Sequence, residues 1–149
     1  MDFVQDLRAA LTARFGEGIQ IEDVDFAKRG CQLEITASGD DIEAAASVMD
    51  RLGFALEAIS GVDWLAEGAM ELVYDFNKMA DGGRVAIRVR VPREKPELPS
   101  ISGIFGGANW HEREAHDMYG IVFSGHPNLT PLLLPEDSTI HPLRKDFSA

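Results

Sequence analysis

The residue types best suited to chemistry gather in one short stretch of this chain. Two histidines stand beside three carboxylates there: His111, Glu112, Glu114, His116 and Asp117. Side chains of these types bind metal ions and transfer protons in many enzymes. One hypothesis is therefore a self-contained metal or acid–base enzyme that uses His111, Glu112 and His116.

The spacing of the two histidines argues against a metal site. The zinc pattern His-Glu-x-x-His places its histidines four residues apart, on one face of a helix. His111 and His116 are five residues apart, which rotates their side chains by about 140° on a regular helix. Glu112 and His116 share a face, but no further ligand has a suitable spacing. The sequence therefore predicts no catalytic, cofactor-binding or metal-binding residue.

A helix over residues 108–119 is expected to position these side chains. Residues three and four apart are neighbours on a helix, so we expect Arg113 to reach Asp117 and Glu112 to reach His116. A solvated helix face with weak ion pairs would account for the charges of this helix. It would not account for the specific residues that continue beyond the helix.

The segment after this helix combines prolines with large apolar side chains. The residue before each proline is pushed towards extended backbone, so no helix or paired strand is expected to run far. Ordering such a segment costs about 1–2 kcal/mol per residue. Burying its seven large apolar side chains, at about 1.5–3 kcal/mol each, offsets about half of that cost. We therefore expect a tail that becomes ordered against a folded surface, on this domain or on another subunit. The seven are Leu129, Leu132, Leu133, Leu134, Ile140, Leu143 and Phe147.

The earlier part of the chain predicts one α+β domain. Apolar residues at helical spacing predict helices over 3–15 and 40–52, each followed by glycine. Alternating apolar and polar residues predict strands over 19–24, 31–37, 54–63, 70–76 and 84–91, the last two joined as a hairpin. The expected fold class is α+β, a single antiparallel or mixed sheet with helices packed on one face over residues 1–121. An extended docking tail follows over residues 122–149.

One face of the last predicted strand carries Arg84, Arg88 and Arg90. In one interpretation, carboxylates of the neighbouring strand, Glu71 and Asp75, neutralise this face, at about 0.2–1 kcal/mol for an exposed pair. In the other, the face meets an acidic surface of a partner. The sequence does not separate the two.

Composition disfavours several classes of protein. The net charge of −11 disfavours nucleic-acid binding, since phosphates would be repelled. No apolar run approaches the roughly 18 residues that cross a bilayer. The single cysteine, Cys31, can form no internal disulfide and fits a reducing cytoplasm. Acidic residues near the start, Asp2 and Asp6, disfavour a signal peptide.

Charged residues stand at fixed offsets beside prolines and leucines in five motifs, over residues 109–114, 117–121, 125–127, 135–137 and 141–147. The order of these motifs resembles the C-terminal signature of the 30 kDa subunit of respiratory complex I, the NADH–quinone oxidoreductase. The matching subunit of energy-converting membrane-bound hydrogenases carries the same signature. The resemblance implies that the residues of the signature serve partner docking. They are Trp110, Glu112, Arg113, Glu114, Asp117, Gly120, His126, Pro127, Pro135, Glu136, Asp137, His141, Pro142, Leu143, Arg144, Lys145 and Asp146.

The resemblance implies a non-catalytic peripheral-arm subunit of a membrane-associated NADH–quinone oxidoreductase. Such a subunit docks on the quinone-reactive, hydrogenase-like large subunit, beside iron–sulfur subunits, at the cytoplasmic face of the cytoplasmic membrane, and supports assembly. It carries no cofactor, and NADH, flavin, iron–sulfur clusters and quinone belong to its partners. The equivalent subunit of an energy-converting nickel–iron hydrogenase, with the NiFe centre in a partner, is the alternative.

The resemblance also assigns roles within the signature. The helix residues around Arg113 hold the start of the tail. Arg144, Lys145 and Asp146 form a clamp on the large subunit, with Glu136 and Asp137 as charged partners upstream. We expect Arg113 to make a partly buried bidentate contact with a carboxylate, because its planar guanidinium suits that geometry.

Overall fold

A computed structural model describes residues 2–149 of the chain. The helices are α1 (Phe3–Phe15), α2 (Phe26–Arg29), α3 (Ile42–Arg51) and α4 (Ala108–Tyr119). The strands are β1 (Gln20–Asp23), β2 (Leu33–Ala37), β3 (Ala55–Trp64), β4 (Ala69–Lys78), β5 (Gly83–Pro92), β6 (Glu97–Pro99) and β7 (Val122–Ser124). Short 3-10 turns follow α1, precede α3 and join β3 to β4.

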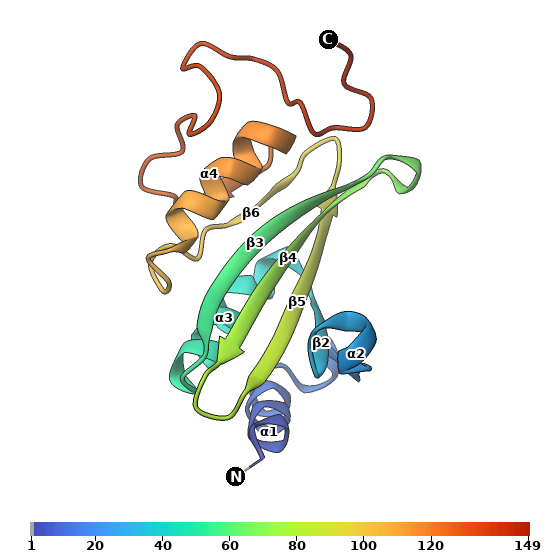
Figure 1. Ribbon diagram of the computed structural model, residues 1–149, viewed down its shortest axis with the longest axis vertical. Coiled ribbons are helices and arrows are strands. Elements are labelled where there is room, and N and C mark those ends of the chain that lie inside the picture. Colours follow the sequence, from blue (N-terminus) through green and yellow to red (C-terminus); the bar gives the residue numbers. More distant parts are fainter. Residues whose placement is uncertain (1) are drawn as a thin grey trace.

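The larger sheet has five strands in the order β1-β2-β5-β4-β3. β2 and β5 run parallel, whereas the other neighbours are antiparallel. α3 lies behind this sheet in Figure 1, and a single cluster of buried residues joins the sheet to α1, α3 and α4. The predicted class, a mixed sheet in an α+β fold, is confirmed.

Alternation and helical spacing explain how the core forms. Leu7 and Leu11, one helical turn apart, are fully buried on α1, and Asp2 caps the start of that helix by accepting the Val4 N–H at 3.0 Å. On the central strands, buried side chains such as Leu72 and Ile87 alternate with polar ones that point to the opposite face. α1, α3 and α4 therefore pack on one face of the sheet.

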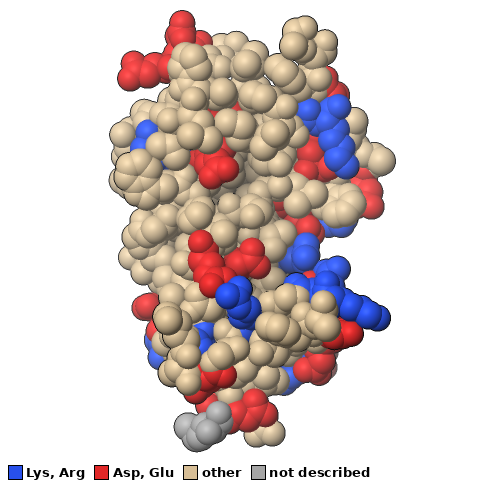
Figure 2. Space-filling view, in the orientation of Figure 1, with Lys and Arg blue, Asp and Glu red and all other residues tan. Residues whose placement is uncertain are grey.

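The other face of the sheet carries the predicted arginines, and carboxylates of neighbouring strands neutralise them. Arg88 lies 3.0 Å from Glu71 and 3.4 Å from Glu34, and Arg90 lies 3.3 Å from Glu71. On the face seen in Figure 2, basic side chains lie next to acidic ones rather than in a patch of their own. The interpretation in which neighbouring strands neutralise this face is confirmed. Glu71 pairs as predicted, whereas Glu34 of β2 takes the place predicted for Asp75.

The sequence did not predict three of the elements, α2, β6 and β7. α2 is a single turn capped by Asp25, whose side chain accepts the Ala27 N–H at 3.0 Å. β6 and β7 form a separate parallel pair, with buried Leu98 opposite buried Phe123. The first three residues of the expected tail therefore pack with the domain, and the irregular segment begins after β7.

Candidate partner-docking site

α4 ends at a glycine that the tail approaches closely. Gly120 has φ 76°, a left-handed conformation that glycine adopts without strain, and its N–H bonds the His116 carbonyl at 2.8 Å. A Cβ atom at this position would lie 2.9 Å from His141 Nε2 and 3.2 Å from Arg144 Nη2. Gly120 therefore ends the helix and leaves room for the last part of the tail.

Glu112 is fully buried and ties α4 to the loop after β6. Its carboxylate accepts the Ser100 hydroxyl at 2.6 Å and the Ile101 N–H at 2.8 Å. Burial raises the pKa of Glu112 above its ordinary value, although both hydrogen bonds oppose that shift. The predicted contact between Glu112 and His116 is wrong, because His116 Nδ1 lies 2.8 Å from the Ile121 carbonyl instead.

Asp117 binds three consecutive backbone N–H groups of the tail with one oxygen. Oδ2 accepts hydrogen bonds from Leu132, Leu133 and Leu134 at 2.8, 2.7 and 3.3 Å. Asp117 is only 3% exposed, and hydrogen bonds to a shielded charge are stronger than those between neutral groups. One carboxylate on the helix therefore fixes the path of the tail at its root.

Arg113 also binds tail backbone rather than a carboxylate. Its Nε donates to the Thr130 carbonyl at 3.0 Å and its Nη2 to the Pro131 carbonyl at 2.9 Å. The contact is bidentate as predicted, but the predicted carboxylate partner and the pair with Asp117 are both wrong. The irregular tail has carbonyls without a ladder partner, and a guanidinium fork can satisfy two of them at once.

The tail returns to the C-terminal end of α4. The last carbonyls of a helix have no partner within it, and side chains and backbone of the tail donate to three of them here. The three bonds are His141 Nδ1 to Asp117 O at 3.0 Å, Leu143 N to Met118 O at 3.1 Å, and Arg144 Nε to Tyr119 O at 2.7 Å. The tail thus supplies hydrogen-bond donors to carbonyls at the end of α4 that have no partner within the helix.

A buried carboxylate at the end of β3 binds the last part of the tail. Asp63 Oδ2 accepts the Lys145 N–H at 2.8 Å, and both Asp63 oxygens pair with Arg93 at 2.8 and 3.0 Å. Arg93 also lies 2.7 Å from Asp146. The Arg93 guanidinium lowers the pKa of Asp63 and that of Asp146. Nothing in the sequence spacing indicated Asp63 or Arg93.

The remaining residues of the signature divide into bonded and free side chains. His126 Nε2 lies 3.2 Å from the Asn109 carbonyl, and its Nδ1 accepts the Asn128 N–H at 3.0 Å. Glu136 and Asp137 are exposed and make no ion pair within residues 2–149. The structure therefore does not bring these two carboxylates to Arg144 or Lys145.

The prolines of the signature differ in exposure. Pro127 and Pro135 are exposed, whereas Pro142 is half-buried.

Large apolar side chains of α4 and the tail face solvent, although the backbone beside them is hydrogen-bonded. Leu129 does pack against the core, and Leu132 and Leu134 are half-buried. The exposed side chains are Trp110 at 60%, Leu133 at 62%, Ile140 at 48%, Leu143 at 51% and Phe147 at 38%. We call these five the apolar docking surface, after the docking that the resemblance predicts for this part of the chain.

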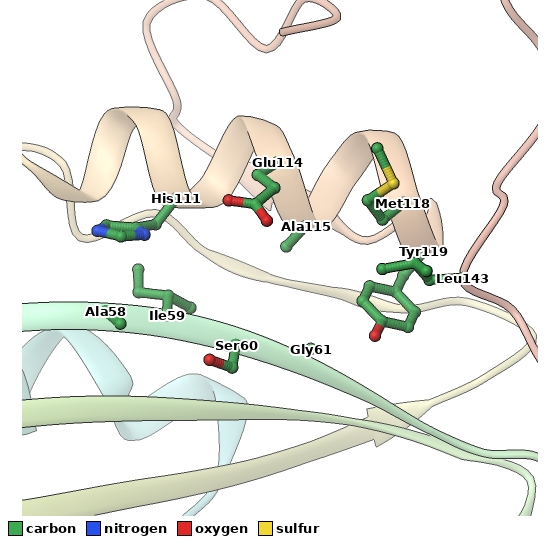
Figure 3. Close-up of a pocket in the computed structure, with 10 residues that line it drawn as sticks. All are labelled: Ala58, Ile59, Ser60, Gly61, His111, Glu114, Ala115, Met118, Tyr119 and Leu143. Atoms are coloured by element: carbon green, nitrogen blue, oxygen red, sulfur yellow. The ribbon is translucent and has the colours of Figure 1, made fainter. Parts of the chain in front are cut away.

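The side chains proposed for an enzyme do not converge. Within residues 2–149, no three His, Cys, Asp or Glu side chains lie close enough to hold a metal ion. Glu112 is bonded to Ser100, His116 lies against the Ile121 carbonyl, and His111 lines a cavity of about 300 Å³ on another side of α4 (Figure 3). None of the helices described is both long and apolar enough to cross a membrane.

Comparison with protein families and curated proteins gives one consistent match. The family described as "Respiratory-chain NADH dehydrogenase, 30 Kd subunit" matches residues 35–149. An NADH-quinone oxidoreductase subunit of Salinispora arenicola is 39% identical over 152 residues, covering 98% of this chain and 60% of the relative. The corresponding subunit of Chlorobium phaeobacteroides is 36% identical over 151 residues, covering 96% of this chain and 91% of the relative. The chain thus spans 60% of the Salinispora relative and 53% of a Roseiflexus one.

Solved structures share the fold. A chain of the membrane-bound sulfane sulfur reductase, an archaeal respiratory membrane complex, superposes with a TM-score of 0.82 at 25% identity, covering 99% of this chain and 86% of that one. A trypsin-resistant fragment of Nqo5 gives a TM-score of 0.67 at 31% identity, covering 85% of this chain and 96% of the fragment. The likeness to the reductase chain therefore includes nearly the whole chain, with the tail.

Proposed function

The chain belongs to the family of the 30 kDa subunit of respiratory-chain NADH dehydrogenase, and from this premise we propose that it is a docking subunit of a membrane-associated NADH–quinone oxidoreductase. Its partner in this proposal is the hydrogenase-like large subunit that reacts with quinone, with iron–sulfur subunits beside it. The protein lies at the cytoplasmic face of the membrane and supports assembly of the electron-transfer arm. NADH, flavin, iron–sulfur clusters and quinone are bound by the partners.

The observation that carries the proposal is the contrast between backbone and side chains in residues 125–149. Asp117, Arg113 and Asp63 hold the backbone of this segment, while the apolar docking surface faces solvent. Apolar area removed from water contributes about 25 cal/mol per Å², so a partner that covers these side chains gains free energy. A tail already bonded to its own domain loses less conformational entropy on docking than an unfolded one.

Substitution within the apolar docking surface tests the proposal. The double variant Leu133→Ser, Phe147→Ser should reduce co-purification of the large subunit by about tenfold or more, because each lost burial costs about 1.5 kcal/mol or more. Met79→Ser is the matched control, since Met79 is 90% exposed and lies in the turn between β4 and β5, at the opposite end of the molecule from the tail (Figure 1). Both variants should unfold at the temperature of the unsubstituted chain.

Two outcomes would contradict the proposal. Co-purification of the double variant at the unsubstituted yield would show that the apolar docking surface is not an interface. An equal loss with Met79→Ser would show that the loss does not depend on the site.

The second candidate is the equivalent subunit of an energy-converting hydrogenase or a related complex. The superposition on the sulfane sulfur reductase chain over 99% of this chain favours it. The subunits that accompany the chain from native membranes separate the candidates. A flavin-containing NADH-oxidising subunit supports the first candidate, and a NiFe centre without such a subunit supports the second.

A further inference from the structure

The outer edge of β3 has no strand beside it. β3 is the last strand of the five-stranded sheet and pairs only with β4. In a strand paired on one side, alternate N–H and C=O groups point away from the neighbour. Within the described chain, residues 55–62 make no backbone hydrogen bond beyond their ladder with β4. These outward groups are a template for another extended segment.

The two edges of the sheet differ in how they discourage pairing. β1, at the opposite edge, has only four residues and carries Glu22 and Asp23. Short length and charge are common means of keeping an edge strand from pairing. β3 has ten residues, and its middle, residues 58–62, has no charged side chain. β3 is therefore the edge that a partner can extend.

A cavity of about 300 Å³ lies along this edge, beneath α4. Residues 58–61 of β3 form its floor, and three of them, Ala58, Ser60 and Gly61, have small side chains or none. In Figure 3, His111 and Glu114 of α4 lie across the gap from β3. The cavity therefore runs beside the strand. The ring of Tyr119 fills the space over Gly61, and the room for other side chains lies beside residues 58–60.

The lining indicates what the cavity binds. Glu114 is exposed and makes no ion pair among residues 2–149, so a cationic side chain can pair with it. Met118 and Leu143 supply apolar contacts at the same site. Leu143 also belongs to the apolar docking surface, so the two candidate sites share this residue.

We propose that an extended segment of the partner subunit, carrying a lysine or arginine, adds to β3 as a sixth strand beneath α4. Backbone hydrogen bonds to the edge of β3 supply affinity, and the ion pair with Glu114 supplies specificity, as in other cases of strand addition. The inference rests on the proposed docking function, because the same partner would cover both the tail and the groove.

Hydrogen exchange of individual backbone amides tests the strand. The isolated chain is compared with the complex purified from the native membrane. Alternate amides within residues 58–61 should exchange at least about tenfold more slowly in the complex, because only every second amide points to the new strand. Amides of β1 at the opposite edge are the control and should keep their rates.

The outcomes separate this inference from the docking function. Unchanged exchange rates of the amides of residues 58–61, together with slower exchange in the tail, would overturn the proposed strand addition. The proposed docking function would then still stand. Equal slowing at all of residues 58–61 would also overturn it, since a loop or helix would then cover the edge. Failure of the chain to accompany any partner would overturn the docking function itself.

The charged contact has its own test. Glu114→Gln should weaken retention of the partner several-fold and reduce its dependence on salt, because an ion pair is lost while the side chain keeps its size. Glu17→Gln is the control, since Glu17 is also an exposed carboxylate but lies after α1. Equal retention of the partner by the two variants would show that no cationic side chain of the partner pairs with Glu114.

Discussion

The bare face of the sheet and the tail site both gather charged side chains, but they use them differently. On the sheet, arginines pair with carboxylates, as Arg88 does with Glu71 and Glu34. At the tail, Asp117 accepts backbone N–H groups and Arg113 donates to backbone carbonyls. On the sheet, charged side chains therefore neutralise one another. At the tail, they make the hydrogen bonds to backbone groups that a neighbouring strand would make in a sheet.

This difference separates two structural uses of a charged side chain. In a sheet, the backbone N–H and C=O groups are already hydrogen-bonded to neighbouring strands, so the charged side chains on its surface pair only with one another. The tail has no ladder, and each backbone group that leaves water needs a partner. α4 supplies those partners from side chains, and large apolar side chains of the tail stay exposed, as the proposed docking requires.

The largest effect is expected for Asp117→Ala. Three N–H groups lose their acceptor, and each hydrogen bond to a charged group is worth about 1.5–3 kcal/mol. Residues 125–149 of the isolated chain should become an easy substrate for proteases, and docking should fail. Asp137→Ala is the matched control, because Asp137 is an exposed tail carboxylate. Limited proteolysis followed by mass spectrometry measures the change, and equal cleavage of both variants would contradict it.

The next effect concerns the end of α4. Gly120→Ala forces a left-handed alanine and places a Cβ 2.9 Å from His141 Nε2. Gly125→Ala is a close control, because Gly125 has φ 78° but no atom within 4 Å of the added Cβ. Both should lose about 1 kcal/mol from backbone strain. Thermal unfolding measures that loss, and only Gly120→Ala should also weaken docking. Equal docking by the two variants would show that docking does not depend on the close approach of the tail to Gly120.

A smaller effect concerns pH and two buried carboxylates whose pKa values shift in opposite directions. Arg93 lowers the pKa of Asp63, so its stabilisation is present above the unfolded pKa and is lost as pH falls through the folded pKa. Burial raises the pKa of Glu112, so its contribution is greatest below the unfolded pKa and falls as pH rises through the folded pKa.

Urea unfolding between pH 3 and pH 8 separates the two. The stability difference between the unsubstituted chain and Asp63→Asn should shrink towards low pH. The difference between the unsubstituted chain and Glu112→Gln should move in favour of the unsubstituted chain as pH falls. The same trend in both variants would contradict the assignment of opposite shifts.

The smallest effect is expected on the sheet face. Arg84→Ala removes an exposed pair with Glu57, at 3.0 Å, which is worth about 0.5 kcal/mol. Arg84→Ala should leave docking unchanged, whereas Arg113→Ala should impair it. Each of the two variants removes one guanidinium. Binding of the two variants to the large subunit measures the difference. Similar losses would mean that the sheet face is also an interface.

The sequence predicts most of the regular elements because their patterns are local. α4 begins and ends where the spacing and Gly120 indicate, and the β4–β5 hairpin follows from alternation and its glycines. The pair of β6 and β7 was missed because it joins three residues on each side and its strands lie more than twenty residues apart. Short parallel pairs leave no periodic pattern in either strand.

The site was only partly predictable. The resemblance selected Arg113 and Asp117, but the neighbour rule for helices assigned them to each other. That rule ignores backbone groups of the tail, which compete for both side chains. Asp63 and Arg93 were missed because their partners in the tail are far away in the sequence. Lys145 is 82 residues from Asp63, and Asp146 is 53 residues from Arg93. A contact of such separation has no signature in a single sequence.

Oxidative footprinting of side chains tests the central claim most directly. Hydroxyl radicals are applied to the isolated chain and to the complex purified from native membranes. Trp110, Leu133 and Phe147 should be oxidised in the isolated chain and protected in the complex, while Met79 should be oxidised in both. Equal oxidation of the three in both samples would contradict docking through this surface.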